Sequence, residues 1–576
     1  MAIPYFLNPV HTPASTPAIV TQEAVRRLPR WALLVLSLGY VLAGFIGREP
    51  WKSADIAAFG QMREIALGQS AWLLPSFMGQ APEIAALLPY WLGAGFIQIN
   101  TLLGAPLPID VAARVPFALL LGLTLASTWY AVYYLARLPQ AQPVPFAFGG
   151  EAEPVSYARS LADGSLLALL AMLGLAQLSH ETTPTLAQLA FSALLFYAVA
   201  ASSLRLWAPS VALVLASFGL ALSGAPAFGL ALCLAVALVR GLQGDARALV
   251  WACATAVCGL LAAALANSLG LWHAQMGNLP GSARDWFALG KLWVWFTWPA
   301  WPLALVALWR WRKWWRSLHI ALPAAVLAVM VLATIVRPGA DRTLLLAMPA
   351  FACLAAMALP TLHRSVSALI DWFTILFFAG CGLVIWVIYL SMHLNVPVKP
   401  AANVRRLLPG FEPSFSAIAL IAALVATIGW IVVIVWRTGR HRSALWKSLV
   451  IPASGAVTCF VLLTTLWMPM LDYARSYAPM ISRVQLQIGK TGCVHGASLA
   501  QAQATALQFH GRYKVIALFA DQPPSQRCDW MIVDADRLKV ASFTLPDGWQ
   551  QTGSVRRRSS TDSEMLLIYK RIGAGT

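Results

Sequence analysis

Long apolar segments recur along most of this chain, and they constrain its fold more than any other feature. Many of them reach about 18 residues or more, the length of a helix that crosses a lipid bilayer. Of the 576 residues, 59% are hydrophobic and 11% are charged, whereas roughly 25% of the residues in a soluble domain are charged. We therefore expect a polytopic α-helical membrane protein.

About thirteen segments are expected to span the membrane, and the basic residues between them indicate the orientation. The segments are residues 31–47, 112–136, 164–179, 186–204, 209–224, 226–240, 248–268, 292–310, 318–336, 343–360, 366–391, 415–436 and 448–468. Arg26, Arg27 and Arg30 precede the first segment, which places the N-terminus on the cytoplasmic side. The first segment is too long for the apolar part of a cleavable signal and no small-residue cleavage site follows it, so it should remain as a helix.

The formal net charge of +18 comes from basic residues that cluster between the spans, and these are the residues that set the membrane orientation. We find no basic stripe with interleaved aromatic residues, which argues against nucleic-acid binding. We also find no Gly-rich phosphate loop, paired zinc-binding cysteines or Ser/His/Asp constellation. The lack of an ATP-binding motif argues against a primary pump.

Residues 85–104 form a moderately apolar segment that Pro89, Gln98 and Asn100 interrupt. We interpret it as a helix lying on the outer surface of the membrane, and a true transmembrane helix is the alternative. With the surface interpretation the number of spans is odd, so the tail lies outside the cytoplasm. The expected division is a cytoplasmic segment 1–30, a transmembrane domain 31–469 with an external loop 48–111, and an external domain 470–576.

The composition changes after about residue 470, where the chain becomes more polar. Short apolar strand patterns cover residues 514–519, 530–533 and 565–569, and helical spacing covers residues 498–509. A unit of about 100 residues is large enough for its own core. The tail is therefore predicted to be a small α/β domain.

Two of the eight cysteines, Cys493 and Cys528, lie in this tail, and the other six lie in apolar segments. Cysteines outside the cytoplasm can form and keep a disulfide. We therefore expect a Cys493–Cys528 bond, with two separate thiols as the alternative. The other six read as small core or lipid-facing residues.

The first external loop begins with polar residues in a chain that has only 23 acidic residues. Asp55 lies there, a few residues after the first span, and an apolar helical pattern follows it. Ser53 or Asp55 can therefore cap the N-terminus of a helix. A cap also fixes the position of the carboxylate, so a structural and a chemical role can coexist.

Several short motifs of this loop and of later segments resemble one family when they are taken in order. They are Trp51-Lys52-Ser53-Ala54-Asp55, Arg63-Glu64, Gln69-Ser70-Ala71-Trp72-Leu73-Leu74-Pro75, Phe77-Met78-Gly79, Ala81-Pro82-Glu83-Ile84-Ala85, Pro89-Tyr90-Trp91, Ala113-Arg114-Val115-Pro116 and Asp341-Arg342-Thr343-Leu344-Leu345-Leu346-Ala347-Met348-Pro349. The chain resembles the GT-C membrane glycosyltransferases, in particular the bacterial aminoarabinose (ArnT-like) transferase that modifies lipid A and its protein O-mannosyltransferase relatives. The number of spans and the soluble tail are also similar.

The resemblance implies a transferase in a bacterial inner membrane. It would move a sugar from an undecaprenyl-phosphate-type donor to a lipid, glycan or protein acceptor on the periplasmic face. The chain departs from the family pattern at two places. The family's Asp-Glu pair falls on Ala54 and Asp55, and its Glu-Lys pair falls near Ile84 and Ala85, with Glu83 displaced by one residue. The acid of the first motif survives only as Asp55, and the lysine expected near the donor phosphate is missing.

Glycosyl transfer needs a carboxylate that takes the proton of the acceptor and positive charge or a metal at the departing phosphate. Asp55 is the predicted base. The cations expected near the phosphate are Lys52, Arg63, Arg337 and Arg342, and an arginine can hold a phosphate with two hydrogen bonds. For Arg337 and Arg342 the alternative is a contact with lipid headgroups or a pair with Asp341.

His180 and Glu181 lie in the second external loop, where the family keeps an acid. They could orient the acceptor or bind a divalent ion together with Asp55, since histidine and carboxylates can ligate transition metals. Hydrogen bonds at a helix N-terminus are the plainer interpretation.

Two other functions stay open at this point. A lipid or solute transporter would carry polar residues in the middle of its spans and broken helices, and few candidates occur here. A catalytically inactive scaffold is favoured by the two altered motifs and opposed by Asp55 and the outer arginines.

Overall fold

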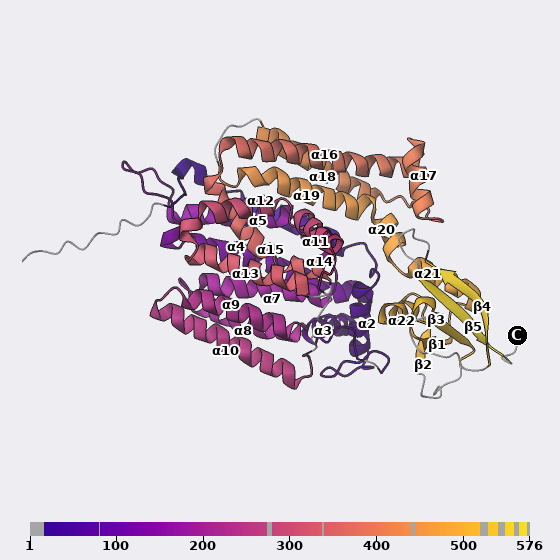
Figure 1. The fold of residues 1–576 in the computed structure, drawn as a ribbon. Helices are drawn as coiled ribbons and strands as arrows, with labels where there is room; N and C mark the ends of the chain where they lie inside the picture. The colour runs from indigo at the N-terminus through magenta and orange to yellow at the C-terminus, as the bar shows by residue number, and fades with distance from the viewer. Residues whose placement is uncertain are drawn as a thin grey trace, which may run out of the picture.

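A helical bundle carries a small α/β domain at one of its ends (Figure 1). The computed structural model describes residues 16–79, 81–272, 279–336, 339–438, 444–518, 528–538, 548–557 and 564–572. This architecture confirms the fold class expected from the sequence, a mostly helical membrane protein with a small C-terminal sheet domain. We call the end of the bundle that carries the α/β domain the domain end.

The long helices of the bundle follow the apolar segments of the sequence. They are α1 (Arg30–Phe45), α4 (Ile109–Ala136), α5 (Pro154–Ala171), α7 (Pro184–Ala201), α8 (Trp207–Leu222), α9 (Pro226–Gly241), α10 (Ala246–Ser268), α12 (Ala300–Arg310), α13 (Leu318–Val336), α15 (Met348–Ala358), α16 (Arg364–Leu394), α18 (Ala417–Thr438) and α19 (Lys447–Leu466). Pro154, Pro184 and Pro226 are the first residues of three of these helices. A proline fits there because the N–H that it lacks would have no partner inside the helix.

Each predicted span coincides with one helix or with two successive helices. The short helices α6 (Leu175–Leu178), α11 (Ala283–Phe296) and α14 (Ala340–Leu345) extend three of them. Within the described ranges, seven helices are long and apolar enough to cross a membrane, or up to eight if α11 and α12, which are bent by 90°, form one span. The number of thirteen spans therefore stays a prediction.

The helices differ widely in how much protein surrounds them. α7 lies in the middle of the bundle, with 94% of its apolar window buried, whereas only 11% of the window of α18 is buried. α16 and α18 pack on α19 along one side of the bundle (Figure 1). Because so little of their apolar surface is buried by protein, α16 and α18 form the outermost layer of the bundle. Outward-facing apolar side chains are expected of helices that contact lipid.

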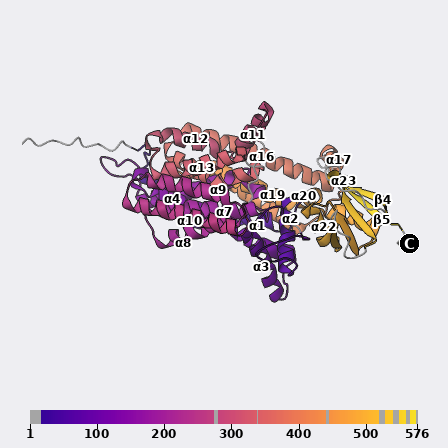
Figure 2. The same cartoon turned by 60° about the horizontal axis from the view of Figure 1, so that its bottom comes forward.

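Two shorter helices, α2 (Ala54–Ala66) and α3 (Leu88–Leu102), lie at the domain end of the bundle (Figures 1 and 2). α3 has 15 residues and runs across the direction of the long helices in Figure 2. The interpretation of residues 85–104 as a helix on the outer surface of the membrane stays a prediction.

The C-terminal sheet has the strand order β2-β1-β3-β5-β4. Its strands are β1 (Cys493–Ala497), β2 (Lys514–Leu518), β3 (Trp530–Asp534), β4 (Trp549–Arg556) and β5 (Met565–Arg571). β1 is parallel to β2 and β3, and β5 is antiparallel to β3 and β4. α22 (Gln501–Phe509) connects β1 to β2, as the helical spacing predicted.

Two strands, β1 and β4, were not predicted from the sequence. β1 contains His495 and Gly496, which interrupt its apolar pattern. β4 is an edge strand whose residues are mostly exposed, so it lacks the continuous apolar run of a buried strand. Cys493, the first residue of β1, is joined to Cys528 by a disulfide with the Cα atoms 5.4 Å apart, the pairing expected from the sequence.

The α/β domain docks on the bundle through α2. Ile56 and Ala57 share a core with the domain residues Tyr477, Met480 and Val484. Gly60 lets the two parts approach closely, because a Cβ there would lie 2.1 Å from the Thr505 hydroxyl oxygen. The boundary expected near residue 470 falls within α20 (Met468–Arg475), and α21 (Ala478–Ile488) follows it.

Candidate functional site

The loop between α1 and α2 carries the centre of the candidate site. Gly47 turns the chain out of α1 with a φ of 74°, a conformation that glycine adopts without strain. Arg48 and Trp51, which follow, are both buried. The Arg48 guanidinium carbon lies 4.8 Å from the centroid of the Trp51 ring, a cation–π contact. The loop thus brings a guanidinium into the interior.

Asp55, in the first turn of α2, is the ion-pair partner of Arg48. Arg48 Nη2 lies 3.1 Å from Asp55 Oδ2, and the two side chains are 2% and 1% exposed. The backbone N–H of Trp51 donates to the same oxygen over 3.0 Å. Thr182 donates to Oδ1 through its backbone N–H, over 2.7 Å, and through its hydroxyl. Each carboxylate oxygen therefore accepts two donors.

The surroundings of Asp55 keep it ionised. Burial by itself raises the pKa of Asp55, but the Arg48 and Arg114 guanidiniums and the donors from Thr182 and Trp51 lower it more. The net pKa lies below the usual value of a carboxyl group. Because its lone pairs are occupied, this geometry favours a role in positioning Arg48. The role of Asp55 as a base stays a prediction.

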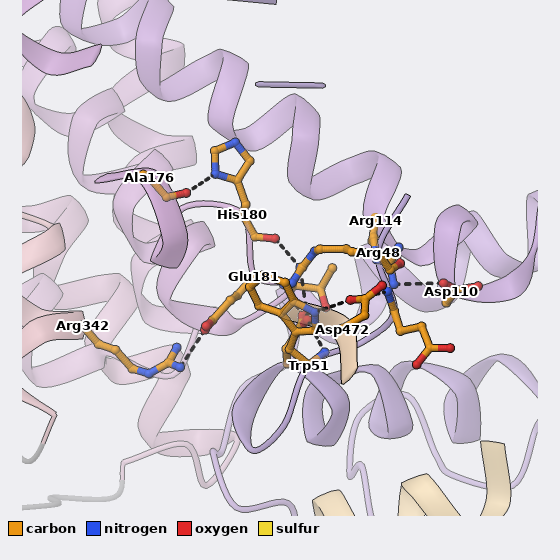
Figure 3. Close-up of polar contacts among 12 residues, drawn as sticks. Arg48, Trp51, Asp110, Arg114, Ala176, His180, Glu181, Arg342 and Asp472 are labelled. Carbon is orange, nitrogen blue, oxygen red and sulfur yellow. Dashed lines mark hydrogen bonds and ion pairs between the residues drawn. The ribbon is translucent and has the colours of Figure 1, made fainter. Parts of the chain in front are cut away.

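Two further residues hold Arg48 and Trp51 from other elements (Figure 3). Arg114, on α4, donates to the Arg48 carbonyl over 2.6 Å and pairs with Asp110 at 2.9 Å. The Trp51 ring N–H donates to Asp472 Oδ1, on α20, over 2.6 Å. The loop is therefore tied to the bundle on one side and to the start of the C-terminal domain on the other.

Glu181 and Arg342 form a second ion pair beside the first. Arg342 Nη2 lies 2.6 Å from Glu181 Oε2, and the side chains are 28% and 7% exposed. Burial raises the pKa of Glu181, Arg342 lowers it and the nearby Asp55 raises it, with a net increase. A carboxylate whose pKa is shifted toward neutrality is suited to accept a proton. The pair thus combines such a carboxylate with a partly exposed guanidinium.

The His180 ring points away from both ion pairs (Figure 3). Its Nδ1 lies 2.5 Å from the Ala176 carbonyl oxygen, and its Nε2 lies 3.0 Å from that of Tyr40. Burial lowers the pKa of His180 to about 4, so the ring is neutral at physiological pH. His180 contacts the site only through its carbonyl, which accepts from Arg48. This orientation does not support the predicted roles of the imidazole toward an acceptor or a metal ion.

The Arg63 side chain and the Glu83 backbone contact the C-terminal domain. Arg63, on α2, donates to Gln508 Oε1 over 3.3 Å. The Glu83 backbone N–H donates to Gln501 Oε1 over 3.3 Å. Both glutamines belong to α22, so these contacts lie in the docking interface.

Lys52 lies at the edge of the site, and Arg337 cannot be placed. The backbone N–H of Lys52 donates to the Arg475 carbonyl over 2.8 Å. Arg475 and Arg557 both act electrostatically on the Lys52 ammonium. Arg337, a predicted phosphate ligand, lies outside the described residues. Of the predicted site residues, the structure brings Asp55, Glu181 and Arg342 together.

Arg48, Arg114, Asp472 and Arg475 belong to this site but were not predicted. Arg114 occurs in a motif that the sequence analysis used, and Arg48 lies just before the first motif of the external loop, so their charge in an apolar chain was a signal. Asp472 and Arg475 follow the last span within ten residues, and only the fold brings them to the first loop.

A large apolar cavity lies in the bundle next to His180. Its volume is about 570 Å³. α1, α5, α16 and α19 and the segments that follow α5 and α19 contribute its lining, which consists of Tyr40, Leu170, Met172, Leu173, Ala176, Phe377, Phe378, Gly380, Cys381, Val384, Ile385, Ala456, Cys459, Phe460, Leu463 and Trp467. The His180 ring centroid lies 4.7 Å from that of Phe460 and 5.1 Å from that of Tyr40. One residue therefore separates the cavity from Arg48.

We find no grouping of three His, Cys, Asp or Glu side chains that could hold a metal ion in the part of the chain that the structure describes. Asp55 and Glu181 are each paired with an arginine, and the His180 ring faces elsewhere. We therefore assign no residues to a divalent ion.

The structure resembles two solved structures of ArnT from Cupriavidus metallidurans. For the apo state the TM-score is 0.61 and the sequence identity 14%, over 95% of this chain and 98% of ArnT. For the structure bound to undecaprenyl phosphate the values are 0.60 and 14%, over 94% and 98%. Neither a protein-family model nor a curated relative matches the sequence. The resemblance predicted from the motifs is confirmed at the level of the fold, and the chain has the ArnT-like GT-C fold.

Proposed function

We propose that this protein is a membrane glycosyltransferase that takes a sugar from a polyprenyl-phosphate-linked donor. The acceptor would be a lipid, a glycan or a protein that approaches the domain end of the bundle. In the orientation predicted from the sequence, this end faces the periplasm and the N-terminus faces the cytoplasm of a bacterium.

The observation that carries the proposal is the apolar cavity beside the two ion pairs. A cavity of about 570 Å³ with an almost wholly apolar lining fits part of a prenyl chain and would be a poor site for a free sugar. His180 contacts both the wall of the cavity, through its ring, and Arg48, through its carbonyl. The ArnT structure that contains undecaprenyl phosphate supports the same class of ligand.

The ion pairs offer the groups that glycosyl transfer requires. The acceptor oxygen or nitrogen attacks the anomeric carbon, the bond from that carbon to the phosphate oxygen breaks, and the polyprenyl phosphate leaves with the electron pair. Glu181, with its raised pKa, is our preferred group for taking the acceptor proton. Arg342 is partly exposed beside it and would stabilise the phosphate that leaves.

In this proposal Asp55 has a positioning role, whereas the sequence predicted that Asp55 is the base. Its carboxylate holds Arg48 and the N–H groups of Trp51 and Thr182. We propose that it keeps the loop in the shape that the reaction needs. A direct role as the base would require it to give up at least one of these donors.

The test is a transfer assay with purified protein in lipid, a radiolabelled polyprenyl-phosphate sugar and native-membrane lipids and glycans as acceptors. We expect transfer by the wild type, loss of transfer but not of donor binding in Glu181→Gln, and loss of transfer in Asp55→Asn. Transfer by Glu181→Gln together with no transfer by Asp55→Asn would indicate that Asp55, and not Glu181, is the base.

The transfer assay, together with measurements of donor binding and of lipid movement across vesicles, separates the other functions. A stable wild type that transfers no label from several donors would favour the scaffold or the transporter. Donor binding without transfer would favour a lipid-binding scaffold, and movement of the lipid across vesicles would favour a transporter.

A further inference from the structure

We infer that Arg475, at the C-terminal end of α20, binds the phosphate of the lipid-linked donor, and that Asp472 and Trp51 hold it in position. This inference rests on the proposed function and assigns phosphate binding to a residue that the sequence analysis did not select. It gives the site a cation in place of the lysine that the family pattern leads one to expect.

Arg475 lies against the same aromatic ring as Arg48. Its guanidinium carbon is 5.2 Å from the centroid of Trp51, and that of Arg48 is 4.8 Å from it. The carbonyl of Arg475 accepts from the Lys52 backbone N–H, so the end of α20 is bonded to the first loop. Arg475 is therefore fixed at the edge of the ion-pair cluster.

Arg475 differs from four neighbouring arginines in lacking an ion-pair partner among the described residues. Arg48, Arg114, Arg342 and Arg557 are paired with Asp55, Asp110, Glu181 and Glu564, respectively. Among the described residues, no carboxylate lies within ion-pair distance of Arg475, although Glu181 and Arg48 act on it electrostatically. A partly buried guanidinium without a direct ion-pair partner is available to a phosphate, which it can bind with two parallel hydrogen bonds.

The position of Arg475 also suits a ligand whose tail lies in the cavity. Trp467 lines the cavity, and α20 starts with the next residue. Eight residues of helix cover about 12 Å at 1.5 Å per residue. A phosphate at Arg475 would thus lie a short distance beyond the end of the apolar lining, and Arg342 would approach it from the side of Glu181.

Asp472 acts through Trp51 and is a positioning residue. Its Oδ1 accepts from the Trp51 ring N–H over 2.6 Å and from the Glu49 backbone N–H over 3.4 Å. These bonds fix the ring on which Arg475 rests. A structural alternative exists for Arg475 itself, since a cation is favourable at a helix C-terminus and on an aromatic face; this role would not involve phosphate.

The test measures binding of a polyprenyl phosphate without sugar, and of the matching polyprenol without phosphate, to the full chain in lipid nanodiscs. We expect Arg475→Gln to weaken phosphate binding by about tenfold or more, the effect of losing one charge-assisted contact, and to leave polyprenol binding unchanged. Arg405→Gln, on the exposed face of α17 (Val398–Leu407), is the control and should bind both as the wild type does. Equal phosphate binding by Arg475→Gln and the wild type would overturn the inference.

The positioning role needs its own readout. Asp472→Asn keeps an oxygen that can accept from Trp51 and should bind phosphate within about twofold of the wild type, whereas Asp472→Leu should weaken binding by about fivefold. Equal binding by Asp472→Leu and the wild type would leave Arg475 without the support that we assign to it.

A measurement on the wild type covers the case in which the variants do not fold. Phenylglyoxal modifies exposed arginines, and mass spectrometry can locate the products. Polyprenyl phosphate should protect Arg475 and polyprenol should not, while Arg405 should react in all samples. Equal modification of Arg475 with and without polyprenyl phosphate would overturn the inference, whereas a wild type that binds no polyprenyl phosphate at all would instead contradict the proposed function.

Discussion

Two arginine–aspartate pairs lie at opposite ends of the bundle, and their surroundings differ. Arg48 pairs with Asp55 at the domain end, where the two side chains are 2% and 1% exposed. Arg437 pairs with Asp371 near the other end, between α18 and α16, where each side chain is 14% exposed. The second pair has Lys447 as a further cation nearby and ties the outermost helices together.

The difference shows that a buried ion pair does not by itself mark a functional site. Around Asp371 the charges serve helix packing, and no second carboxylate–arginine pair adjoins them among the described residues. Around Asp55, the described residues include a second pair, Glu181–Arg342, and a cation with no direct ion pair, Arg475. An apolar cavity lies next to His180, whose carbonyl accepts from Arg48. We therefore locate the chemistry by the combination of groups and not by burial.

The largest effect should follow from breaking the pair at the domain end. Arg48→Gln leaves Asp55 buried without its counter-charge, which costs roughly 3–5 kcal/mol when a buried pair loses one partner. We expect a large drop in the thermal unfolding temperature and complete loss of transfer. Thermal unfolding in lipid and the transfer assay measure the two effects.

A double variant provides the control for this prediction. Arg48→Gln combined with Asp55→Asn removes both charges and should recover part of the lost stability, because no unpaired charge is then buried. A single Arg48→Gln variant as stable as the wild type would show that the pair does not hold the loop.

A smaller effect, on stability alone, is expected at the other end. Asp371→Asn should lower the free energy of unfolding by about 1–3 kcal/mol, between the values for exposed and fully buried pairs. Binding of polyprenyl phosphate by the folded variant should equal that of the wild type. Weaker binding, measured at a temperature where the variant is folded, would mean that the two ends are coupled and would break the comparison.

Filling the cavity tests its part in the comparison. Cys459→Phe adds volume to the cavity wall and should weaken binding of a long polyprenyl phosphate by about tenfold, or 1.4 kcal/mol, with less effect on a short-chain analogue. Cys253→Phe, on the exposed side of α10, is the matched control. Equal binding by the Cys459→Phe variant would place the prenyl chain elsewhere.

The smallest effect concerns pH. The pKa of Glu181 is raised by burial and by Asp55 and lowered by Arg342, so a base at this position loses activity as the pH falls through a value above the usual carboxyl range. Removing the charge of Arg342 in Arg342→Gln should move the midpoint of the pH–rate profile upward. A midpoint that does not move would argue against Glu181 as the base, since Arg48 and Arg475 stay in place.

The sequence predicted the helices better than it predicted the site. α18 and α16 are nearly continuous apolar segments in which length alone identifies a span, and β2, β3 and β5 are short apolar runs. β4 was not predicted because an edge strand with mostly exposed residues has no continuous apolar run. α3 was predicted as a helix, and its position on the membrane surface, inferred from the polar residues that interrupt its apolar segment, stays a prediction.

The site was harder to predict because its residues meet only in the folded chain. Asp55, Glu181 and Arg342 were selected as unusual charges on the outer side, and they do lie together. The same reasoning also selected Arg63, which contacts α22 instead. Glu83 was considered through the family motif, and its backbone also contacts α22. Asp472 and Arg475 were missed because nothing in the sequence shows which loop α20 approaches.

The bond between Trp51 and Asp472 joins residues that are 421 positions apart in the chain. A ribosome therefore releases the first loop long before it makes the helix that supports it. Chains generally fold from the N-terminus during synthesis. The bond between Trp51 and Asp472, however, can form only after most of the chain has been synthesised. Nascent chains and truncated products that end before α20 thus contain α1 to α19 and still lack a finished site, so the proposed activity would be confined to molecules that include the C-terminal part of the chain.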